Sequence, residues 1–423
     1  MDMQKHFRDV LTSLYDRPPP HARESTPPLL LNSRETAANT KHFEEFVESL
    51  LPLTLKSQRD QDKKAHLAAL KIITHTLIQC MFRWESVALP KSPDAYTKGR
   101  YLNHIGLTRR IVVRCIDSLC GGEEYLEDPD TGWMYQLRCG FLSPNGINQA
   151  AQFFPTKQFM NMFFESLYTD FGGWDDMTDD KLYIFKDVPQ KDIPPISSYQ
   201  DKLAIIRNYN NFMRDHSWAM KSPSYRSMSK APQRGGRIYN HFQNIANRRF
   251  PLRATTLIDG YPIAEPDFTA NHLWMFSKLH GEELPDDPYN EIVKITGCTR
   301  DQVKSVTTVM LGARNLKQKG KTIADASKRK IACSSDNMRS ILSALESTYP
   351  WLAKHNAFYN DTGSKLQFLE GEIALEMMAW ATSIELPLLV VHDAFAVPEQ
   401  HEAMVYEKML ETRSSVPSKF ETI

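Results

Sequence analysis

The sequence predicts an α+β protein with a mainly helical N-terminal part and a C-terminal part that mixes helices with short strands. Between about residues 41 and 120, apolar residues recur at helical spacing, and "KHFEEFVESLL" places four of them on one face: Phe43, Phe46, Val47 and Leu50. After about residue 176, short apolar runs alternate with Gly/Pro turns and helical segments. This second pattern is typical of an α+β domain with a mixed or antiparallel sheet.

The expected division of the chain follows from these changes in pattern. Residues 1–40 include the Pro-rich stretch "RPPPHARESTPPLL" and are expected to form a partly flexible N-terminal segment. Residues 41–175 are expected to form a helical domain, and residues 176–423 the α+β domain. A chain of 423 residues is long enough for each domain to bury its own core.

Charge is balanced over the whole chain but not locally. Lys+Arg and Asp+Glu both number 51, so net charge does not indicate a partner. Residues 201–260 carry eleven Lys or Arg against three Asp, and residues 300–330 carry nine against two. Such regions in a neutral protein indicate a face that binds a polyanion, although a solvated basic surface is the simpler explanation.

The six cysteines show no CxxC pair and no spacing typical of metal ligands. They are typical of reduced intracellular thiols that fill a core. No run of about 18 apolar residues is present, and the N-terminus lacks the apolar segment of a signal peptide. We therefore expect a cytoplasmic protein with no membrane contact.

Residues 96–141 have the pattern of a winged helix. "LTRRIVVRCIDSL" predicts a helix with an apolar stripe, and Arg109, Arg110 and Arg114 lie away from that stripe, which consists of Leu107, Ile111, Cys115 and Leu119. The following "EYLEDPDTGWMYQLRCG" predicts strand, turn and strand, which would be the wing. We expect Arg110 and Arg114 to contact DNA; an ordinary helix and hairpin with a solvated basic face is the alternative.

The stretch from Gly235 to Arg249, "GGRIYNHFQNIANRR", mixes basic, aromatic and amide side chains. Two adjacent glycines allow the backbone to approach another group closely. Arginines and amides of this kind suit contacts with phosphates and base edges. The alternative is a structured loop whose arginines pair with carboxylates of the same protein.

A possible cation ligand follows a predicted strand. "TTLIDGYP" and "PIAEPDF" predict two strands, the second ending at Asp267, and Asn271 is expected to cap a helix that begins at His272. The carbonyl of Phe268 is also available to a cation there. A lone aspartate at such a junction is more often a cap or turn residue.

A helix with two neighbouring cations is predicted from "CTRDQVKSVTTVMLGA". Thr299 and Gln302 form a capping box, so the helix begins at Arg300, with a core stripe of Val303, Val306 and Met310. Arg300 and Lys304 lie one turn apart. They repel each other unless an anion such as a triphosphate lies between them; a solvated basic face is again the alternative.

The stretch "LPLLVVHDAFAVPE" predicts a tight hairpin. Its arms are "LLVV" and "AFAV", and His392 and Asp393 lie at the bend. Asp393 could thereby lie beside Asp267 on a neighbouring strand. Two close carboxylates repel each other unless they bind divalent cations, so the pair predicts a metal site.

The order of these stretches resembles that of the family A nucleic-acid polymerases. Residues from about 234 to 400 are similar to bacterial DNA polymerase I and, more distantly, to the single-subunit phage-type RNA polymerases. "GGRIY" with "QNIANR" resembles the family's Gly-Arg and Gln-Asn-Ile segment, with a shortened gap. "DFTANH" resembles motif A, "RDQVKSVTTVMLGA" motif B and "VHDAF" motif C, while "EGEIALEMM" occupies the place of the family's Gln-Gly helix.

The resemblance implies a right-handed palm-and-fingers domain and two-metal nucleotidyl transfer. Asp267 and Asp393, with the carbonyl of Phe268, would hold two Mg²⁺ ions, or Mn²⁺ in their place. Arg300 and Lys304 would hold the triphosphate of an incoming nucleotide. His392 would lie near the primer terminus.

The resemblance also implies a DNA primer–template and nucleoside triphosphates as partners. Arg237, Gln243 and Arg248 match family positions that contact primer or template, and Glu370 begins the helix that precedes motif C. We expect all four to bind nucleic acid.

Four positions depart from the family pattern. Thr308 and Gly312 stand in the nucleotide pocket where the family has an aromatic residue or Met and a Tyr. His272 follows Asp267 by five residues, where DNA polymerases have a Glu that excludes the 2′-hydroxyl. Ala394 replaces the acid that follows the motif C aspartate in DNA polymerase I. Sugar choice and fidelity are therefore left open by the sequence.

Our first interpretation is a compact family A-like DNA polymerase, used for gap filling, lesion bypass or primase-like synthesis. The second is a single-subunit RNA polymerase or primase, favoured by Ala394 and opposed by the bulk of His272. The third is a degenerate polymerase that acts as a DNA-binding replication-initiation module. A phosphohydrolase of the His-Asp type has only the dipeptide at 392–393 in its favour.

Overall fold

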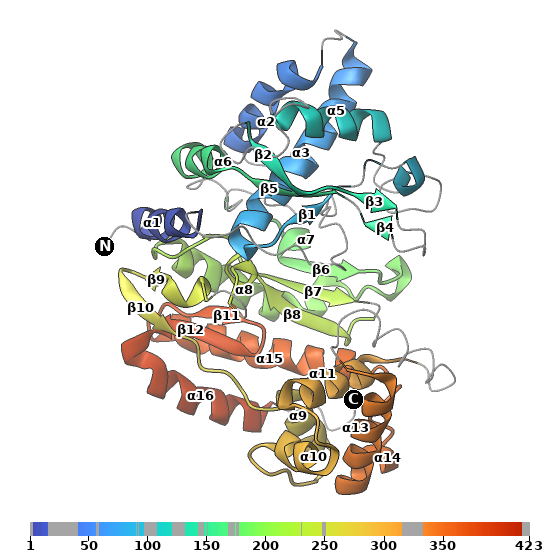
Figure 1. The fold of residues 1–423 in the computed structure, drawn as a ribbon. Coiled ribbons are helices and arrows are strands. Elements are labelled where there is room, and N and C mark those ends of the chain that lie inside the picture. Colours follow the sequence, from blue (N-terminus) through green and yellow to red (C-terminus); the bar gives the residue numbers. More distant parts are fainter. Residues whose placement is uncertain are drawn as a thin grey trace. The chain divides into compact units, whose positions relative to one another are not determined.

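The computed structural model describes residues 3–15, 41–55, 59–89, 91, 93–96, 108–120, 132–142, 148–149, 151–167, 174, 177–229, 231–247, 251–314 and 333–416. The chain forms two compact units. The first unit consists of residues 1–177, 216–223 and 241–263, and the second of residues 178–215, 224–240 and 264–423. The fold is mixed α+β, as the sequence predicts (Figure 1).

The first unit is mainly helical and carries three small groups of strands. Strands β1, β5 and β2 form one antiparallel sheet with β5 in the middle, while β3 pairs with β4 and β9 with β10. The helices and strands are α1 (Met3–Tyr15), α2 (Lys41–Thr54), α3 (Asp60–Arg83), β1 (Val87–Ala88), α5 (Arg109–Leu119), β2 (Met134–Arg138), β3 (Phe141–Leu142), β4 (Asn148–Gln149), β5 (Gln152–Pro155), α6 (Lys157–Met162), β9 (Leu257–Ile258) and β10 (Tyr261–Ala264). A π-helix, η4 (Phe163–Leu167), follows α6, and single 3₁₀ turns are η2 (Pro93–Tyr96), η7 (Phe242–Asn244) and η8 (Arg253–Thr255).

Helix α3 forms the centre of this unit. Most of its second half is buried, and Phe82 stacks on Phe7 of α1 with ring centroids 5.6 Å apart. The helix is long and apolar enough to cross a membrane by length and composition alone, but 78% of its most apolar window is buried inside the protein. That burial is typical of the core helix of a globular unit.

Helix α5 lies where the sequence predicts the recognition helix. Arg109, Arg110 and Arg114 are exposed, and the buried residues are Val112, Cys115, Ile116 and Leu119. Cys115 and Leu119 are buried as predicted, whereas Ile111 is only half-buried and Val112 and Ile116 complete the apolar stripe; Leu107 lies outside the described residues. The first arm and turn of the expected wing fall among residues 121–131, outside the described residues, and β2 pairs with β5.

The second unit contains a three-stranded sheet and a hairpin, both associated with helices. In the sheet, β6 pairs in parallel with β7, and β7 pairs in antiparallel with β8. The elements are α7 (Asp179–Leu182), β6 (Tyr183–Lys186), α8 (Gln200–Arg214), β7 (Tyr225–Ser229), β8 (Gly235–Tyr239), α9 (Asn271–Leu279), α10 (Pro288–Thr296), α11 (Arg300–Gly312), α13 (Ser335–Thr348), α14 (Trp351–Lys354), α15 (Thr362–Ser383), β11 (Leu389–Val391), β12 (Ala394–Pro398) and α16 (Glu402–Ser415). Three 3₁₀ turns connect them: η5 (Gln190–Asp192), η6 (Ile196–Ser198) and η10 (Glu399–His401).

Helix α15 packs directly on strand β8 (Figure 1). Gly371 lies at the contact, where a β-carbon would overlap the carbonyl oxygen of Gly236 and lie only 2.8 Å from its carbonyl carbon. A residue with a side chain would therefore hold the helix away from the strand. The glycine allows the residues on either side of it, Glu370 and Glu372, to reach groups on the sheet.

Local signals in the sequence set several boundaries correctly and three incorrectly. The helix expected to begin at Glu370 is α15, which begins at Thr362. The capping box of Thr299 and Gln302 is present, and α11 begins at Arg300 as predicted. Strand β10 ends at Ala264, before Asp267, which makes only an isolated bridge. Asn271 is the first residue of α9 and does not cap it, because Ala270 occupies the cap position in a left-handed conformation with φ 52°.

Candidate functional site

The β11–β12 hairpin brings the two predicted aspartates together within the second unit. Val391 pairs with Ala394, which leaves His392 and Asp393 as a two-residue turn, and His392 has φ 61°. Asp267 forms an isolated antiparallel bridge with Ala394, and the Phe395 amide donates to the Pro266 carbonyl at 3.1 Å. The turn predicted at His392–Asp393 is therefore present, and Asp267 pairs with the residue that follows it.

Both aspartates lie in a crowded acidic environment. The pKa of Asp393 is raised to about 7, first by burial and then by the charges of Glu370 and Asp267, against the opposing effect of Arg237 and His272. Burial also raises the pKa of Asp267, and here Lys304 and the backbone N–H of Phe268 act in the opposite direction. Ionising both groups at once is costly without additional positive charge.

Glu370 is the third carboxylate of this site and it is almost completely buried. Its Oε2 accepts a hydrogen bond from Nε of Arg237 at 2.5 Å, and its Oε1 lies 2.9 Å from Nε2 of His272. Nδ2 of Asn271 lies 3.5 Å from the same Oε1. Burial alone would raise the pKa of Glu370, but His272 and Arg237 outweigh it and hold that pKa well below its usual range.

Helix α11 presents the predicted nucleotide-binding residues along one face. Lys304, Thr308 and Gly312 follow one another at intervals of four residues and are all exposed. The charge of Lys304 lowers the pKa of Asp267, so the lysine lies within electrostatic range of that aspartate. No described heavy atom lies within 4 Å of a β-carbon built on Gly312, so the end of this face is open.

Arg300 already has a partner, which the sequence analysis did not predict. Its Nε donates to Oδ2 of Asp287 at 2.7 Å, and its guanidinium lies 5.4 Å from the ring of Tyr289. Asp287 caps α10 through its other oxygen, which accepts from the Tyr289 amide. The sequence "DDPYN" contains the signal for this cap, an acidic residue directly before a proline at the first helical position.

The predicted nucleic-acid contacts fall in different parts of the chain. Arg237 lies on β8 in the second unit, where it is paired with Glu370. Gln243 lies in the 3₁₀ turn η7, and Arg110 and Arg114 lie on α5. All three belong to the first unit, whereas the two aspartates belong to the second. Arg248 lies outside the described residues. His392 is in the turn, with its ring 6.1 Å from that of Tyr239.

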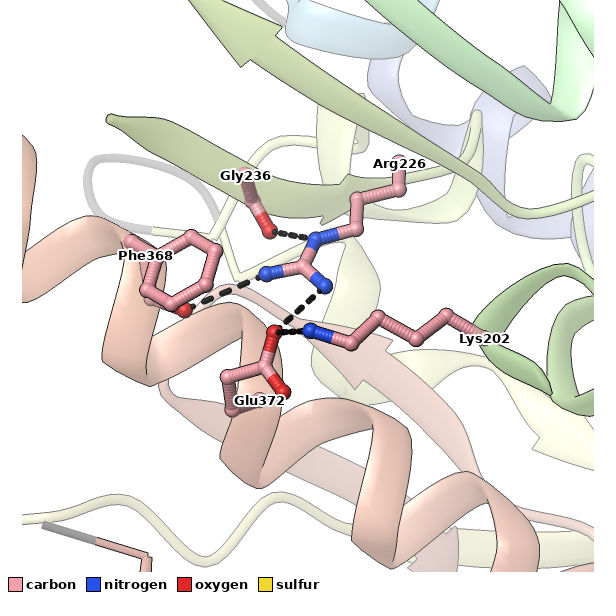
Figure 2. A network of polar contacts seen from close by, with 5 residues as sticks. All are labelled: Lys202, Arg226, Gly236, Phe368 and Glu372. Carbon is pink, nitrogen blue, oxygen red and sulfur yellow. Dashed lines mark hydrogen bonds and ion pairs between the residues drawn. The ribbon is translucent and has the colours of Figure 1, made fainter. Parts of the chain in front are cut away.

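Much of the positive charge between residues 201 and 260 is neutralised inside the protein. Arg226 is fully buried and contacts Glu372 at 2.7 Å, the Gly236 carbonyl at 2.8 Å and the Phe368 carbonyl at 3.3 Å (Figure 2). Lys202 meets the same Glu372, and Arg234 pairs with Asp361. For these residues the simpler explanation, pairing with carboxylates of the same protein, is the correct one.

The ligands that the resemblance implies fit a hard divalent cation in chemical type. Carboxylate and carbonyl oxygens are the donors that Mg²⁺ prefers, and Asp267, Asp393 and the carbonyl of Phe268 supply them. Within the described ranges, His, Cys, Asp and Glu side chains do not gather in groups of three or more that could hold a metal ion. The candidate set is thus a pair of aspartates, with Glu370 engaged by Arg237 and His272.

Comparisons of the chain with models of protein families, with curated proteins and with solved structures found no match.

Proposed function

We propose that the protein catalyses template-dependent nucleotidyl transfer, as a compact DNA polymerase similar to family A. The observation that carries the proposal is the juxtaposition of Asp267 and Asp393, from segments far apart in the sequence, at the β11–β12 turn. The order of motifs in the sequence supports the same reaction. In this proposal the second unit has a palm-and-fingers arrangement, with α11 on the fingers side.

Asp267, Asp393 and the carbonyl of Phe268 would hold Mg²⁺, or Mn²⁺ in its place. Bound there, the cations would neutralise the charge that develops on the transferring phosphoryl group and activate the attacking hydroxyl. The protein's own contribution is to hold Asp393 in a half-buried two-residue turn and Asp267 on the segment that bridges to the next residue, Ala394.

Lys304 is the residue best placed to position the triphosphate of a nucleotide. It is exposed and lies within electrostatic range of Asp267, so an anion bound to it would lie near the aspartates. Arg300 would contribute only after it leaves Asp287, because a guanidinium held by a carboxylate is already neutralised. His392, in the turn beside Asp393, would face the primer terminus.

Exposed arginines on α5 would give the first unit a role in binding the primer–template. Arg110 and Arg114 lie on the exposed side of that helix, where phosphates can reach them. In this proposal the protein works in the cytoplasm on DNA and nucleoside triphosphates.

The test is labelled nucleotide incorporation on a primed DNA template, with dNTPs and NTPs in separate reactions. We compare the wild type, Asp393→Asn and, as a matched control, Asp336→Asn, whose side chain is 93% exposed on α13. Extension with dNTPs that EDTA abolishes, that is lost in Asp393→Asn and that is kept in Asp336→Asn is the expected result.

Two other results would replace this proposal. Extension with NTPs, or product without a primer, would make the protein an RNA polymerase or primase. No extension with either nucleotide, together with salt-sensitive DNA binding that survives Asp393→Asn, would refute catalysis and favour a DNA-binding replication-initiation module.

A further inference from the structure

Arg413, in the last turn of helix α16, has no carboxylate partner among the described residues (Figure 1). Its side chain is half-buried, and its Nε atom is buried without a hydrogen-bond partner in that same part of the chain. Other arginines of the second unit each pair with a carboxylate: Arg226, Arg234, Arg237, Arg300 and Arg339. Arg413 therefore differs from these arginines in keeping its charge unpaired.

Aromatic rings surround the guanidinium of Arg413. Its central carbon lies 4.2 Å from the ring centre of Trp274 on α9 and 4.7 Å from that of Phe268. The rings attract the charge but do not replace an anion. Lys278 adds a second cation, 5.7 Å from the same Trp274 ring.

The surroundings of Arg413 favour binding of an anion. Burial lowers the pKa of Arg413, and among the described residues Tyr406 acts in the opposite direction. An arginine still keeps its charge in a protein, and a half-buried charge without a partner is costly. A bound carboxylate would offset that cost through hydrogen bonds to the planar fork of the guanidinium.

Two exposed apolar side chains lie beside this cation. Leu410 and Tyr406 precede Arg413 by one and two turns on the same side of α16, and they are 36% and 42% exposed. Long side chains on a helix point back toward its N-terminus, so Arg413 is directed toward these two residues. The effect of Tyr406 on the pKa of Arg413 agrees with this direction.

The other charges of α16 favour a peptide over a nucleic acid. Glu402, Glu407 and Glu411 are exposed on this helix, against the cations Lys408 and Arg413. Lys408 already pairs with Glu411 at 3.0 Å. A nucleic-acid backbone needs several cations along its path, whereas a single carboxylate needs only one.

We propose that Arg413, Trp274, Tyr406 and Leu410 form a docking site for a peptide segment that carries one carboxylate close to a large apolar side chain. We call these four residues the Arg413 surface. The carboxylate pairs with the guanidinium, and the apolar side chain covers Tyr406 and Leu410. The inference goes beyond the proposed function and does not depend on it, because it concerns a protein partner and not the reaction.

The first measurement is an NMR titration of the full chain with a defined peptide. The probe is Ser-Gly-Asp-Leu-Phe-Gly-Ser with both ends blocked, so that the aspartate is its only charge. The Nε–H signal of Arg413, identified by its loss in Arg413→Met, should shift with a Kd below about 1 mM.

Two control peptides separate the contributions of charge and apolar contact in the wild-type protein. Asparagine in place of the aspartate should weaken binding about tenfold or more, since the charge-assisted hydrogen bonds are lost. Serine in place of both apolar residues should weaken it about threefold or more. Neither control depends on whether a variant of the protein folds.

The second measurement compares variants by isothermal titration calorimetry with the same probe. Arg413→Met keeps the length of the side chain and removes its charge, so the Kd should rise about tenfold or more. Leu410→Ser should raise it about threefold. Arg339→Met, at a position 59% exposed on α13, is the matched control and should keep the wild-type Kd. Circular dichroism and urea denaturation establish that each variant is folded.

Equal binding of the aspartate and asparagine peptides would refute the role of the carboxylate. An Arg413 signal that does not shift below about 5 mM peptide would refute the site itself.

Three results would assign the Arg413 surface to another occupant and overturn the proposal. Tighter binding of a short oligothymidylate at the Arg413 signal would make it a nucleic-acid contact. A signal that depends on protein concentration would indicate a second copy of the chain. A signal that shifts when residues 417–423 are removed would assign the surface to that segment, which lies outside the described residues. A failure of nucleotide incorporation would bear on the proposed function alone.

Discussion

Gly371→Ala tests how closely α15 must approach β8. The added β-carbon would overlap the Gly236 carbonyl oxygen and lie 2.8 Å from its carbon and 2.9 Å from Nη2 of Arg226. Carbon atoms in contact normally lie about 3.5–4.0 Å apart, so the helix and strand would have to separate by roughly 1 Å. The Gly236 carbonyl belongs to the backbone of β8, so it cannot rotate away as a side chain could.

We expect this variant to lose about 3–5 kcal/mol of stability in the second unit. Overpacking alone costs about 1–3 kcal/mol, and separation of the two elements would also loosen the buried pair of Arg226 and Glu372. The gain of about 0.5–1 kcal/mol that alanine normally gives over glycine in a helix is small beside these terms. Native-state hydrogen exchange of the α15 and β8 amides, with urea denaturation, measures the change.

Gly312→Ala is the matched control. It also lies in a helix, and its β-carbon would meet no described atom within 4 Å. We expect a change of under about 1 kcal/mol, toward greater stability. If Gly371→Ala behaved like Gly312→Ala, the close contact between α15 and β8 would be wrong.

Two further predictions concern buried charge. Glu372→Ala leaves the fully buried Arg226 without its carboxylate and should lower the free energy of unfolding, measured in urea, by about 3–5 kcal/mol. The double variant Arg226→Met/Glu372→Leu should recover most of that loss. If it does not, the unpaired charge of Arg226 is not the cause of the loss. Burial lowers the pKa of His75 to about 3. Below about pH 6.5, His75 therefore binds a proton in the unfolded chain but stays neutral in the folded unit. The free energy of unfolding of the first unit should therefore fall as pH drops from about 6.5 toward 3, and His75→Phe should show a flatter dependence.

The features that the sequence predicts well depend on neighbouring residues. The capping box at Thr299 and the tight turn at His392–Asp393 each need only a few adjacent side chains, and both are present. The approach of Asp267 to Asp393 was also predicted, because Asp267 was expected to end a strand that lies beside the hairpin of Asp393. Such signals are local, so one sequence is enough to read them.

The features that were missed depend on distant contacts. Glu370 was expected to bind nucleic acid, yet it is buried because Gly371 lets α15 approach the strand that carries Arg237. Arg300 was expected to hold a triphosphate, and its ion pair with Asp287, at the start of the preceding helix, was not predicted. Neither pairing leaves a local pattern, because each joins residues brought together only by the packing of whole elements.

The interleaving of the two units along the chain determines how the protein can be divided. Residues 216–223 and 241–263 belong to the first unit although residues of the second unit precede and follow them. Inside the first unit, the Ala246 amide donates to the carbonyl of Phe82 at the end of α3. A cut near residue 177 would separate such partners, so neither half would fold as a truncated fragment. Isolating one unit would require circular permutation, or bridging of the excised segments with linkers.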